Sequence, residues 1–329
     1  MTIPAIPSSS SQQQEVASFK VSIPAIEDET TTTTTTTTQP EESESSSKPV
    51  TMTEEESSGV KSMRAALTQE EIDSFPDPYM PLRHFRAEKG DVTKAIRKLQ
   101  ATIRWRKEFG VLDLVRAFDE ENNKSINNSN EKSLSVVLQN ENETGKIYVR
   151  GYDSEGRALM YMRPGKENTL NETNNLRHLV FQLEKAIACS SRHNHSNSKI
   201  CIIIDYEGFA LRKAPPMSTS KRTLDILQNH YPERMHRAYI CNPPFVFRTF
   251  WTLIQPFIDP VTKEKICFVS STKGMQRLVR DVGGDESQLE SCCTGTKQTH
   301  LRPFDSKEYL LELPFDVAFD ESISTTTTT

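Results

Sequence analysis

The stretch from Tyr231 to Phe268 constrains the fold of this chain more than any other. It predicts a short strand over residues 238–241 and a break at Pro243-Pro244. It then predicts an apolar helix over residues 245–258, a turn at Asp259-Pro260 and a second strand over residues 265–269. Arg248 is the only charged residue in that helix. A helix that is apolar on nearly every side is either buried in a core or covers an apolar surface.

Upstream of this stretch, apolar runs of strand length alternate with runs of helical period. Strands are predicted at residues 146–151, 158–162 and 200–204, and helices between them at residues 176–187 and 223–230. The run at 200–204 is apolar throughout, which is typical of a strand buried on both faces. Alternating strands and helices predict an α/β domain with a mostly parallel, twisted sheet and flanking helices.

The rest of the chain divides by composition. Residues 1–62 are rich in Ser and Thr and poor in aromatic residues, so we expect a disordered acidic tail. Helical patterns and the N-cap candidate Asp91 predict a small all-helical lobe over residues 63–118. The polar residues 119–133 predict a loop insertion, residues 134–290 the α/β domain, and residues 291–329 a partly disordered extension.

Charge and cysteine content exclude several classes of protein. The net charge is −5, of which residues 1–62 carry −7, so the remainder is close to +2; this argues against nucleic acid as a partner. We expect neither a signal peptide nor a membrane-spanning segment, because no long apolar run occurs. The six cysteines lack a framework spacing, which favours a reducing, cytoplasmic setting.

Four motifs stand out in the second half of the chain. They are Tyr231-Pro232-Glu233-Arg234-Met235, Asn242-Pro243-Pro244-Phe245, Trp251, and Pro256-Phe257-Ile258-Asp259-Pro260-Val261-Thr262 with Lys265-Ile266. Together they resemble the signature of the CRAL-TRIO family, and within it the branch of Sec-fourteen-like phosphatidylinositol-transfer proteins. The segment around Arg86, followed by a helix that ends at Trp105-Arg106, is similar to the helical lobe of that family. The resemblance covers roughly residues 77–282 and fades after Gly283-Gly284.

The resemblance implies that residues 245–258, here named the gate segment, form a movable gate over a lipid cavity. The residues it assigns to gate and cavity are Phe245, Phe247, Phe250, Trp251, Ile254, Ile200 and Ile202. The aromatic residues of this set could line the lid or meet the membrane when the gate opens; taken one at a time, ordinary core packing explains them equally well. Both alternatives stay open.

The resemblance also implies a site for an inositol headgroup. The residues that match it are Glu233, Thr262 and Lys265, and Lys89 and Arg86 can add positive charge for a phosphate. The family has a basic pair where this chain has Glu88-Lys89, so one cation is replaced by an anion. A simple surface ion pair between Glu233 and Lys265 is the alternative interpretation.

Other sites are weaker predictions. Hydroxyl residues that relatives use for phosphatidylcholine are replaced by Ile200 and Ile202, which argues against that lipid. Asp205 ends a strand, where it is either a ligand contact or part of a turn. A zinc site built from Cys189, His193, His195 and Cys201 has poor spacing, and no nucleophile elbow or P-loop occurs, so we predict no metal, no cofactor and no enzymatic activity.

Together these observations predict a monomeric, cytoplasmic protein that touches membranes peripherally. It would bind one phospholipid, with phosphatidylinositol favoured, and transfer or present it. The alternatives are a lipid sensor or scaffold that presents the lipid to partner enzymes or trafficking proteins, and a carrier of tocopherol, a retinoid or a sterol.

Overall fold

A five-stranded sheet forms the centre of the structure, with the strands in the order β1-β2-β3-β4-β5. The strands are β1 (Ile147–Tyr152), β2 (Ala158–Met162), β3 (Ile200–Asp205), β4 (Met235–Cys241) and β5 (Ile266–Phe268). β1 pairs with β2 in antiparallel fashion, and the other three pairings are parallel. The prediction of a mostly parallel sheet is confirmed.

The computed structural model describes residues 51–118, 133–193, 199–210, 212, 214, 216–269, 272–284, 289–290 and 305–311. The predictions for the first fifty residues, for residues 119–132 and for most of the C-terminal extension lie outside these ranges. In the part that is described, no helix is long and apolar enough to cross a bilayer.

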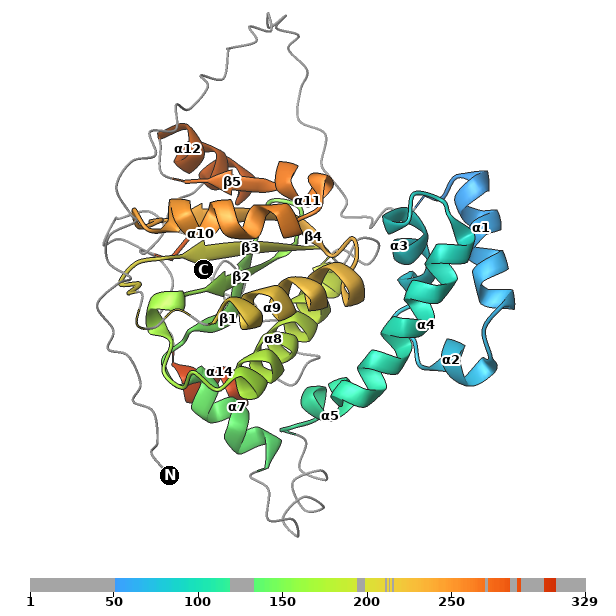
Figure 1. The fold of residues 1–329 in the computed structure, drawn as a ribbon, viewed down its shortest axis with the longest axis horizontal. Helices are drawn as coiled ribbons and strands as arrows, with labels where there is room; N and C mark the ends of the chain where they lie inside the picture. Colours follow the sequence, from blue (N-terminus) through green and yellow to red (C-terminus); the bar gives the residue numbers. More distant parts are fainter. Residues whose placement is uncertain are drawn as a thin grey trace, which may run out of the picture. The chain divides into compact units, whose positions relative to one another are not determined.

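The connections between the parallel strands place their helices on one face of the sheet. Parallel crossovers are right-handed, and β2 to β5 follow one another without reversal of direction, so successive connections lie on the same side. They contain α8 (Glu172–His193), α9 (Met217–His230), and α10 (Phe247–Ile254) with the 3-10 helix η3 (Gln255–Phe257) and α11 (Pro260–Glu264). Figure 1 shows α8 and α9 running across the sheet, with α10 near β4.

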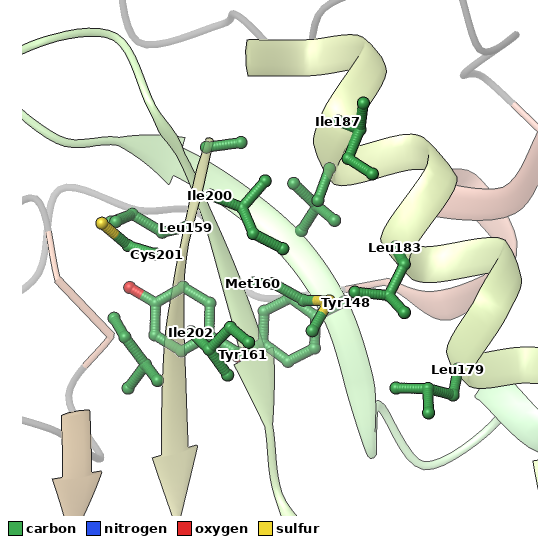
Figure 2. Packing of buried hydrophobic residues seen from close by; sticks show 14 of the residues in the cluster. Tyr148, Leu159, Met160, Tyr161, Leu179, Leu183, Ile187, Ile200, Cys201 and Ile202 are labelled. Carbon is green, nitrogen blue, oxygen red and sulfur yellow. The ribbon is translucent and has the colours of Figure 1, made fainter. Parts of the chain in front are cut away.

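Side-chain alternation decides which strand residues face these helices. The register aligns Met160, Ile202, Ala238 and Ile266 in one row, and Met162, Ile204 and Ile240 in the next row on the same face. Figure 2 shows Leu179, Leu183 and Ile187 of α8 directed toward the sheet, with Met160 near Leu183. Helix α8 therefore fills one part of this face with ordinary core packing.

The opposite face carries Tyr161, Ile203 and Tyr239 in register. The hydroxyl of Tyr239 donates to Asp281 at the end of α12 (Thr272–Asp281), and the backbone N–H of Glu290 lies 3.5 Å from the hydroxyl of Tyr161. Segments C-terminal to the sheet thus supply partners for these buried tyrosines.

Within residues 51–118, five helices form the N-terminal lobe. They are α1 (Glu54–Ala65), α2 (Gln69–Asp73), α3 (Met80–Ala87), α4 (Val92–Phe109) and α5 (Val111–Val115). Asp91 caps α4 as predicted, since its side chain accepts from the N–H of Lys94. The lobe has its own small core of Met63, Met80, Phe85, Ala95 and Leu99.

Helix α1 corrects one predicted boundary, because it begins at Glu54, inside the segment 1–62 that was predicted to be disordered. Thr53 and Glu56 form a capping box, and the acidic residues of the first turn stabilise the positive end of the helix dipole. The acidic residues at this point of the predicted tail are therefore a helix-start signal.

Among the helices that were not predicted are α7 (Leu134–Asn142) and α14 (Ser306–Leu311), and α14 lies within the segment predicted to be a partly disordered extension. Tyr309 of α14 is 1% exposed; its hydroxyl donates to Gln182 Oε1 at 2.5 Å and accepts from the N–H of Val149. Lys185 of α8 lies under the Tyr309 ring, 3.7 Å from its centroid. These contacts make α14 part of the folded core.

The packing of α1 on α3 gives a first prediction. A Cβ added at Gly59 would lie 2.3 Å from Cε2 of Phe85, whose ring is buried. Gly59→Ala should lower the free energy of unfolding by about 1 kcal/mol, because the clash outweighs the gain in helix propensity. Ser58→Ala, an exposed change in the same helix, should not be destabilising. Chemical denaturation of both variants tests this, and a Gly59→Ala protein as stable as the parent would contradict it.

Candidate functional site

A cavity of about 860 Å³ lies between the sheet and the helices that cross it. The strand residues on its wall are Met162, Ile200, Ile202, Ile204, Ala238, Ile240 and Ile266, which belong to the face described above. Helix α9 contributes Met217, Leu224 and Leu227, and the gate segment contributes Phe247, Trp251, Ile254 and Ile258. The volume is at the upper end of the usual range for ligand pockets, and the lining is predominantly apolar.

The gate segment divides into an inward and an outward side. Phe247 packs edge-on against Tyr206 at 4.8 Å between ring centroids, and Trp251 packs edge-on against Phe268 at 5.5 Å. In contrast, Phe245 is 85% exposed, Leu253 54% and Phe257 47%. A segment that is apolar on both sides therefore covers the cavity with one side and presents the other to the outside.

Polar contacts hold both ends of the gate segment. Before it, Asn242 has a left-handed backbone (φ 49°), and its side chain donates to Asp205 Oδ1 at 2.9 Å. After it, Gln228 of α9 donates to the carbonyl of Phe257 at 2.9 Å and accepts from the N–H of Asp259 at 3.3 Å. The segment is thus anchored at two points, with α10 between them.

One end of the cavity is lined by charged side chains and one threonine, and we name it the polar end. Its residues are Arg86, Glu88, Lys89, Lys98, Glu233, Arg234, Asp259, Thr262 and Lys265. They come from the end of α3 and the loop after it, from α4, from the turn before β4 and from α11. The polar end therefore lies beside the first residues of β4 and β5, and the last residues of β2 and β3 line the apolar remainder.

Glu233 lies between two lysines at the polar end. Its carboxylate is 3.5 Å from Lys199 Nζ and 3.9 Å from Lys265 Nζ. Its backbone is left-handed (φ 58°), a conformation that a residue other than glycine rarely adopts. The interpretation of Glu233 and Lys265 as an ion pair is compatible with this geometry, and both groups also line the cavity.

Arg86 and Thr262 are held by other residues. Arg86 donates to both carboxylate oxygens of Glu56, at 2.7 and 3.1 Å. Thr262 is half-buried, and its N–H donates to Asp259 Oδ1, which caps α11. The side chain of Lys89 is exposed, in the loop between α3 and α4.

A buried ion cluster that the sequence did not predict supports the polar end from the lobe side. Asp77 Oδ2 accepts from Arg83 at 2.5 Å and from Arg234 at 2.6 Å. Burial tends to raise the pKa of Asp77, but the two guanidinium groups outweigh it, and the pKa is lowered. The same burial lowers the pKa of Arg234 to about 10. The cluster connects the lobe to the turn that carries Glu233.

A second cluster joins the lobe to the sheet domain. Arg106 of α4 donates to both carboxylate oxygens of Glu184 on α8, at 2.7 and 3.1 Å, and the hydroxyl of Tyr231 donates to Glu184 at 2.6 Å. Trp105 stacks on His230 with 4.1 Å between ring centroids. Through Trp105 and Arg106 the lobe thus contacts α8 and His230, a residue just before the turn that carries Glu233.

The cavity brings together most of the residues predicted to form the site. The five headgroup candidates Arg86, Lys89, Glu233, Thr262 and Lys265 all line it, as do Phe247, Trp251, Ile254, Ile200 and Ile202. Phe245 does not line it, because α10 begins two residues later and Phe245 projects outward. The side chain of Phe250 is outside what the structure describes. The binding roles of these residues stay predictions.

Asp205 and the cysteines have structural surroundings. Asp205 is fully buried and accepts from Arg163, Asn242 and the N–H of Glu207, and it is not among the lining residues, which favours the turn interpretation. The Cys201 thiol donates to Asp153 Oδ2 at 3.4 Å. Among the described residues no group of three or more side chains is arranged to hold a metal ion; His195 and the side chain of His193 lie outside them.

The model of the CRAL/TRIO domain matches residues 142–294. The chain is 36% identical over 187 residues to the CRAL-TRIO domain-containing protein C23B6.04c of Schizosaccharomyces pombe, covering 57% of this chain and 16% of that protein. It is 31% identical over 192 residues to the phosphatidylinositol transfer protein PDR17 of Saccharomyces cerevisiae, covering 57% of this chain and 51% of that protein.

A third relative matches over a larger share of its length. The CRAL-TRIO domain-containing protein YKL091C of Saccharomyces cerevisiae is 30% identical over 236 residues, covering 68% of this chain and 73% of that protein. Among solved structures, the chain resembles the crystal structure of Sfh5 with a TM-score of 0.53 and 18% identity, over 79% of this chain and 96% of that one. The likeness to Sfh5 concerns the fold.

The Asp77 cluster gives a prediction about pH. Because the pKa of Asp77 is lower in the folded protein than in the unfolded chain, its stabilising contribution is present above the ordinary aspartate pKa of about 3.9. That contribution is lost as the pH falls through the folded pKa. Near neutral pH, Asp77→Asn should therefore be less stable than the parent by roughly 3 kcal/mol. The difference should shrink in acid.

Denaturant titrations over a series of pH values measure this difference. Asp113→Asn, a change at an exposed aspartate of α5, is the control and should give a small difference at every pH. A stability loss for Asp77→Asn that does not change with pH would mean that the carboxylate charge is not what holds the cluster.

Proposed function

The chain belongs to the CRAL-TRIO family, and we propose that it binds one phospholipid, phosphatidylinositol before others, and transfers or presents it between membranes. The observation that carries this proposal is the cavity, an apolar space with one charged end and a covering gate segment. An amphiphile with acyl chains and an anionic headgroup matches that division. The similarity to a protein named a phosphatidylinositol transfer protein supports the choice of lipid.

The energetics of exchange favour a closed cavity over an open groove. Burial of each CH₂ contributes about 0.8 kcal/mol, so an acyl chain of roughly 16 carbons gains on the order of 12 kcal/mol in a bilayer. A protein that extracts such a chain has to bury it to a similar degree. When it does, exchange is nearly neutral in free energy, and opening of the gate segment sets the rate. A carrier of this kind needs no catalytic group, and we assign none.

Membrane contact is part of the same proposal. The exposed apolar residues Phe245, Leu253, Phe257 and Val261 lie in or directly after the gate segment. The ammonium of Lys221 lies 4.4 Å from the centroid of the Phe257 ring, so a cation accompanies this apolar surface. Apolar side chains with an adjacent cation suit the boundary of an anionic membrane. We propose a monomeric cytoplasmic protein that makes this contact transiently.

At the polar end, we propose that the lipid phosphate is bound by cations that include Lys265 and Lys89, and that Glu233 and Thr262 bind hydroxyl groups of the headgroup. The support is that all four line the same end of the cavity. The negative charge of Glu88 in the same lining favours a headgroup that carries hydroxyl donors as well as a phosphate.

Lys265→Ala tests the headgroup assignment. Loss of a charge-assisted hydrogen bond costs about 1.5–3 kcal/mol, so phosphatidylinositol transfer between vesicles should fall roughly tenfold or more. The matched control is Lys263→Ala, an exposed lysine of the same short helix, which should transfer at the parental rate. Equal transfer by both variants would identify Lys265 and Glu233 as a surface ion pair only.

Ala238→Phe tests the cavity itself. Ala238 lies in the register row between Ile202 and Ile266, on the cavity wall. The cavity has room for a phenyl group there, so the variant can fold, but the ring occupies the space for an acyl chain. We expect a cooperative melting transition and lipid transfer reduced about tenfold or more, since displacing even a few CH₂ groups costs more than 1.4 kcal/mol. Undiminished transfer by a folded variant would show that lipid does not occupy this space.

A further inference from the structure

The polar end contains two guanidinium groups among the described lining residues, Arg86 and Arg234, and a carboxylate from outside the lining holds each of them. Asp77 holds Arg234 in a buried cluster that it shares with Arg83. Glu56 of helix α1 holds Arg86 through two hydrogen bonds. Guanidinium groups are the side chains that bind phosphate bidentately, so these two pairings decide how much phosphate the polar end can bind.

The two pairings differ in how easily they can be broken. The side chain of Arg234 is 7% exposed, whereas that of Arg86 is 36% exposed and that of Glu56 is 18% exposed. Removing a carboxylate from a buried pair leaves a desolvated charge, but removing it from a partly exposed pair leaves a solvated cation. Arg86 is therefore the guanidinium whose pairing can change without damage to the fold.

Glu56 is held in position by its own helix. Its carboxylate accepts from the N–H of Thr53 at 3.0 Å while its N–H donates to the Thr53 hydroxyl at 3.1 Å. Contact between Gly59 and Phe85 fixes α1 on α3, the helix that carries Arg86. The hydrogen bond from Arg86 lowers the pKa of Glu56, so this carboxylate stays ionised at neutral pH. Glu56 is thus a fixed anion beside Arg86. The guanidinium of Arg86 also interacts electrostatically with the carboxylate of Glu233.

From this geometry we propose that Glu56 is a specificity-determining residue: by holding Arg86, it excludes headgroups that carry a phosphate monoester in addition to the phosphodiester. A phosphate monoester carries about −1.5 to −2 charges near neutral pH. In the parent protein that group would meet the anions Glu56, Glu88 and Glu233 without a released guanidinium to bind it. The proposal rests on the function proposed above, because it concerns the same site.

The experiment uses the full chain and two kinds of vesicle, both of phosphatidylcholine, one containing phosphatidylinositol and the other phosphatidylinositol 4-phosphate. Glu56→Gln removes the charge of Glu56 but keeps the capping box, which accepts either Glu or Gln at that position. The matched control is Glu54→Gln, the same change at an exposed residue in the first turn of α1. The measured quantity is the ratio of the two lipids taken up by each protein.

We expect Glu56→Gln to raise the uptake of phosphatidylinositol 4-phosphate relative to phosphatidylinositol about tenfold, since a released charge-assisted contact is worth about 1.4 kcal/mol or more. Glu54→Gln should keep the parental ratio. The double variant Glu56→Gln with Arg86→Gln should lose the gain, because the gain requires the released guanidinium. Thermal melting of each variant confirms that the lobe is folded.

Three outcomes would overturn the proposal. A folded Glu56→Gln protein with the parental ratio would show that Glu56 does not determine specificity. A gain that persists in the double variant, or that Glu54→Gln also produces, would assign the effect to the overall loss of negative charge. If the parent takes up phosphatidylinositol but one of these three outcomes is observed, only the role of Glu56 is wrong. If the parent takes up neither inositol lipid, the proposed function is wrong as well.

Discussion

The fold depends on one face of the sheet that is buried without being filled along its whole length. Helix α8 packs on part of that face in the ordinary way, whereas the part formed by Ile202, Ile204, Ala238 and Ile240 faces a cavity. Right-handed crossovers in one direction along the sheet place α9 and the gate segment over the same face. The chain therefore encloses an apolar space with elements that the topology has already placed there. An apolar space of this size suits a ligand with apolar groups.

Ion pairs between the lobe and the sheet domain complete the polar end of that space. Two ion pairs, Arg234 with Asp77 and Arg106 with Glu184, each join residues that are far apart in sequence. Arg234 directly follows Glu233 in the chain, so the first pair holds the turn of Glu233. Buried pairs of this kind contribute little net stability compared with apolar packing, but breaking one is costly. Their effect is to fix the geometry of the turn, so that the left-handed backbone at Glu233 is maintained.

Sequence patterns predicted the parts of the molecule whose burial is local and periodic. The apolar run at 200–204 and the proline breaks around the gate segment define β3, β4 and α10 to within a few residues, because strand period and proline stereochemistry are properties of the chain itself. Resemblance to a family supplied the residues of the polar end, which no periodicity indicates. All five headgroup candidates line the cavity, and their roles there await the variants described above.

What the sequence could not predict depends on partners far away in the chain. Helix α14 is short and weakly patterned, and it is held because Tyr309 meets Gln182 and Lys185. Glu56 lies in a stretch whose composition predicts disorder, and its ion pair with Arg86 is not indicated by the local sequence. Phe245 belongs to an apolar run, yet α10 starts only at Phe247, and this offset turns the ring of Phe245 outward. For α14 and Glu56 the deciding term is a tertiary contact; for Phe245 it is the position at which α10 starts.

The most direct measurement of the central claim is native mass spectrometry of the full chain after purification without detergent. We expect a species that carries one diacyl phospholipid per protein chain, together with exchange of that lipid when the protein is incubated with vesicles. A protein that has only the mass of its polypeptide, and that gains no lipid mass after such incubation, would contradict the claim that this cavity holds a lipid.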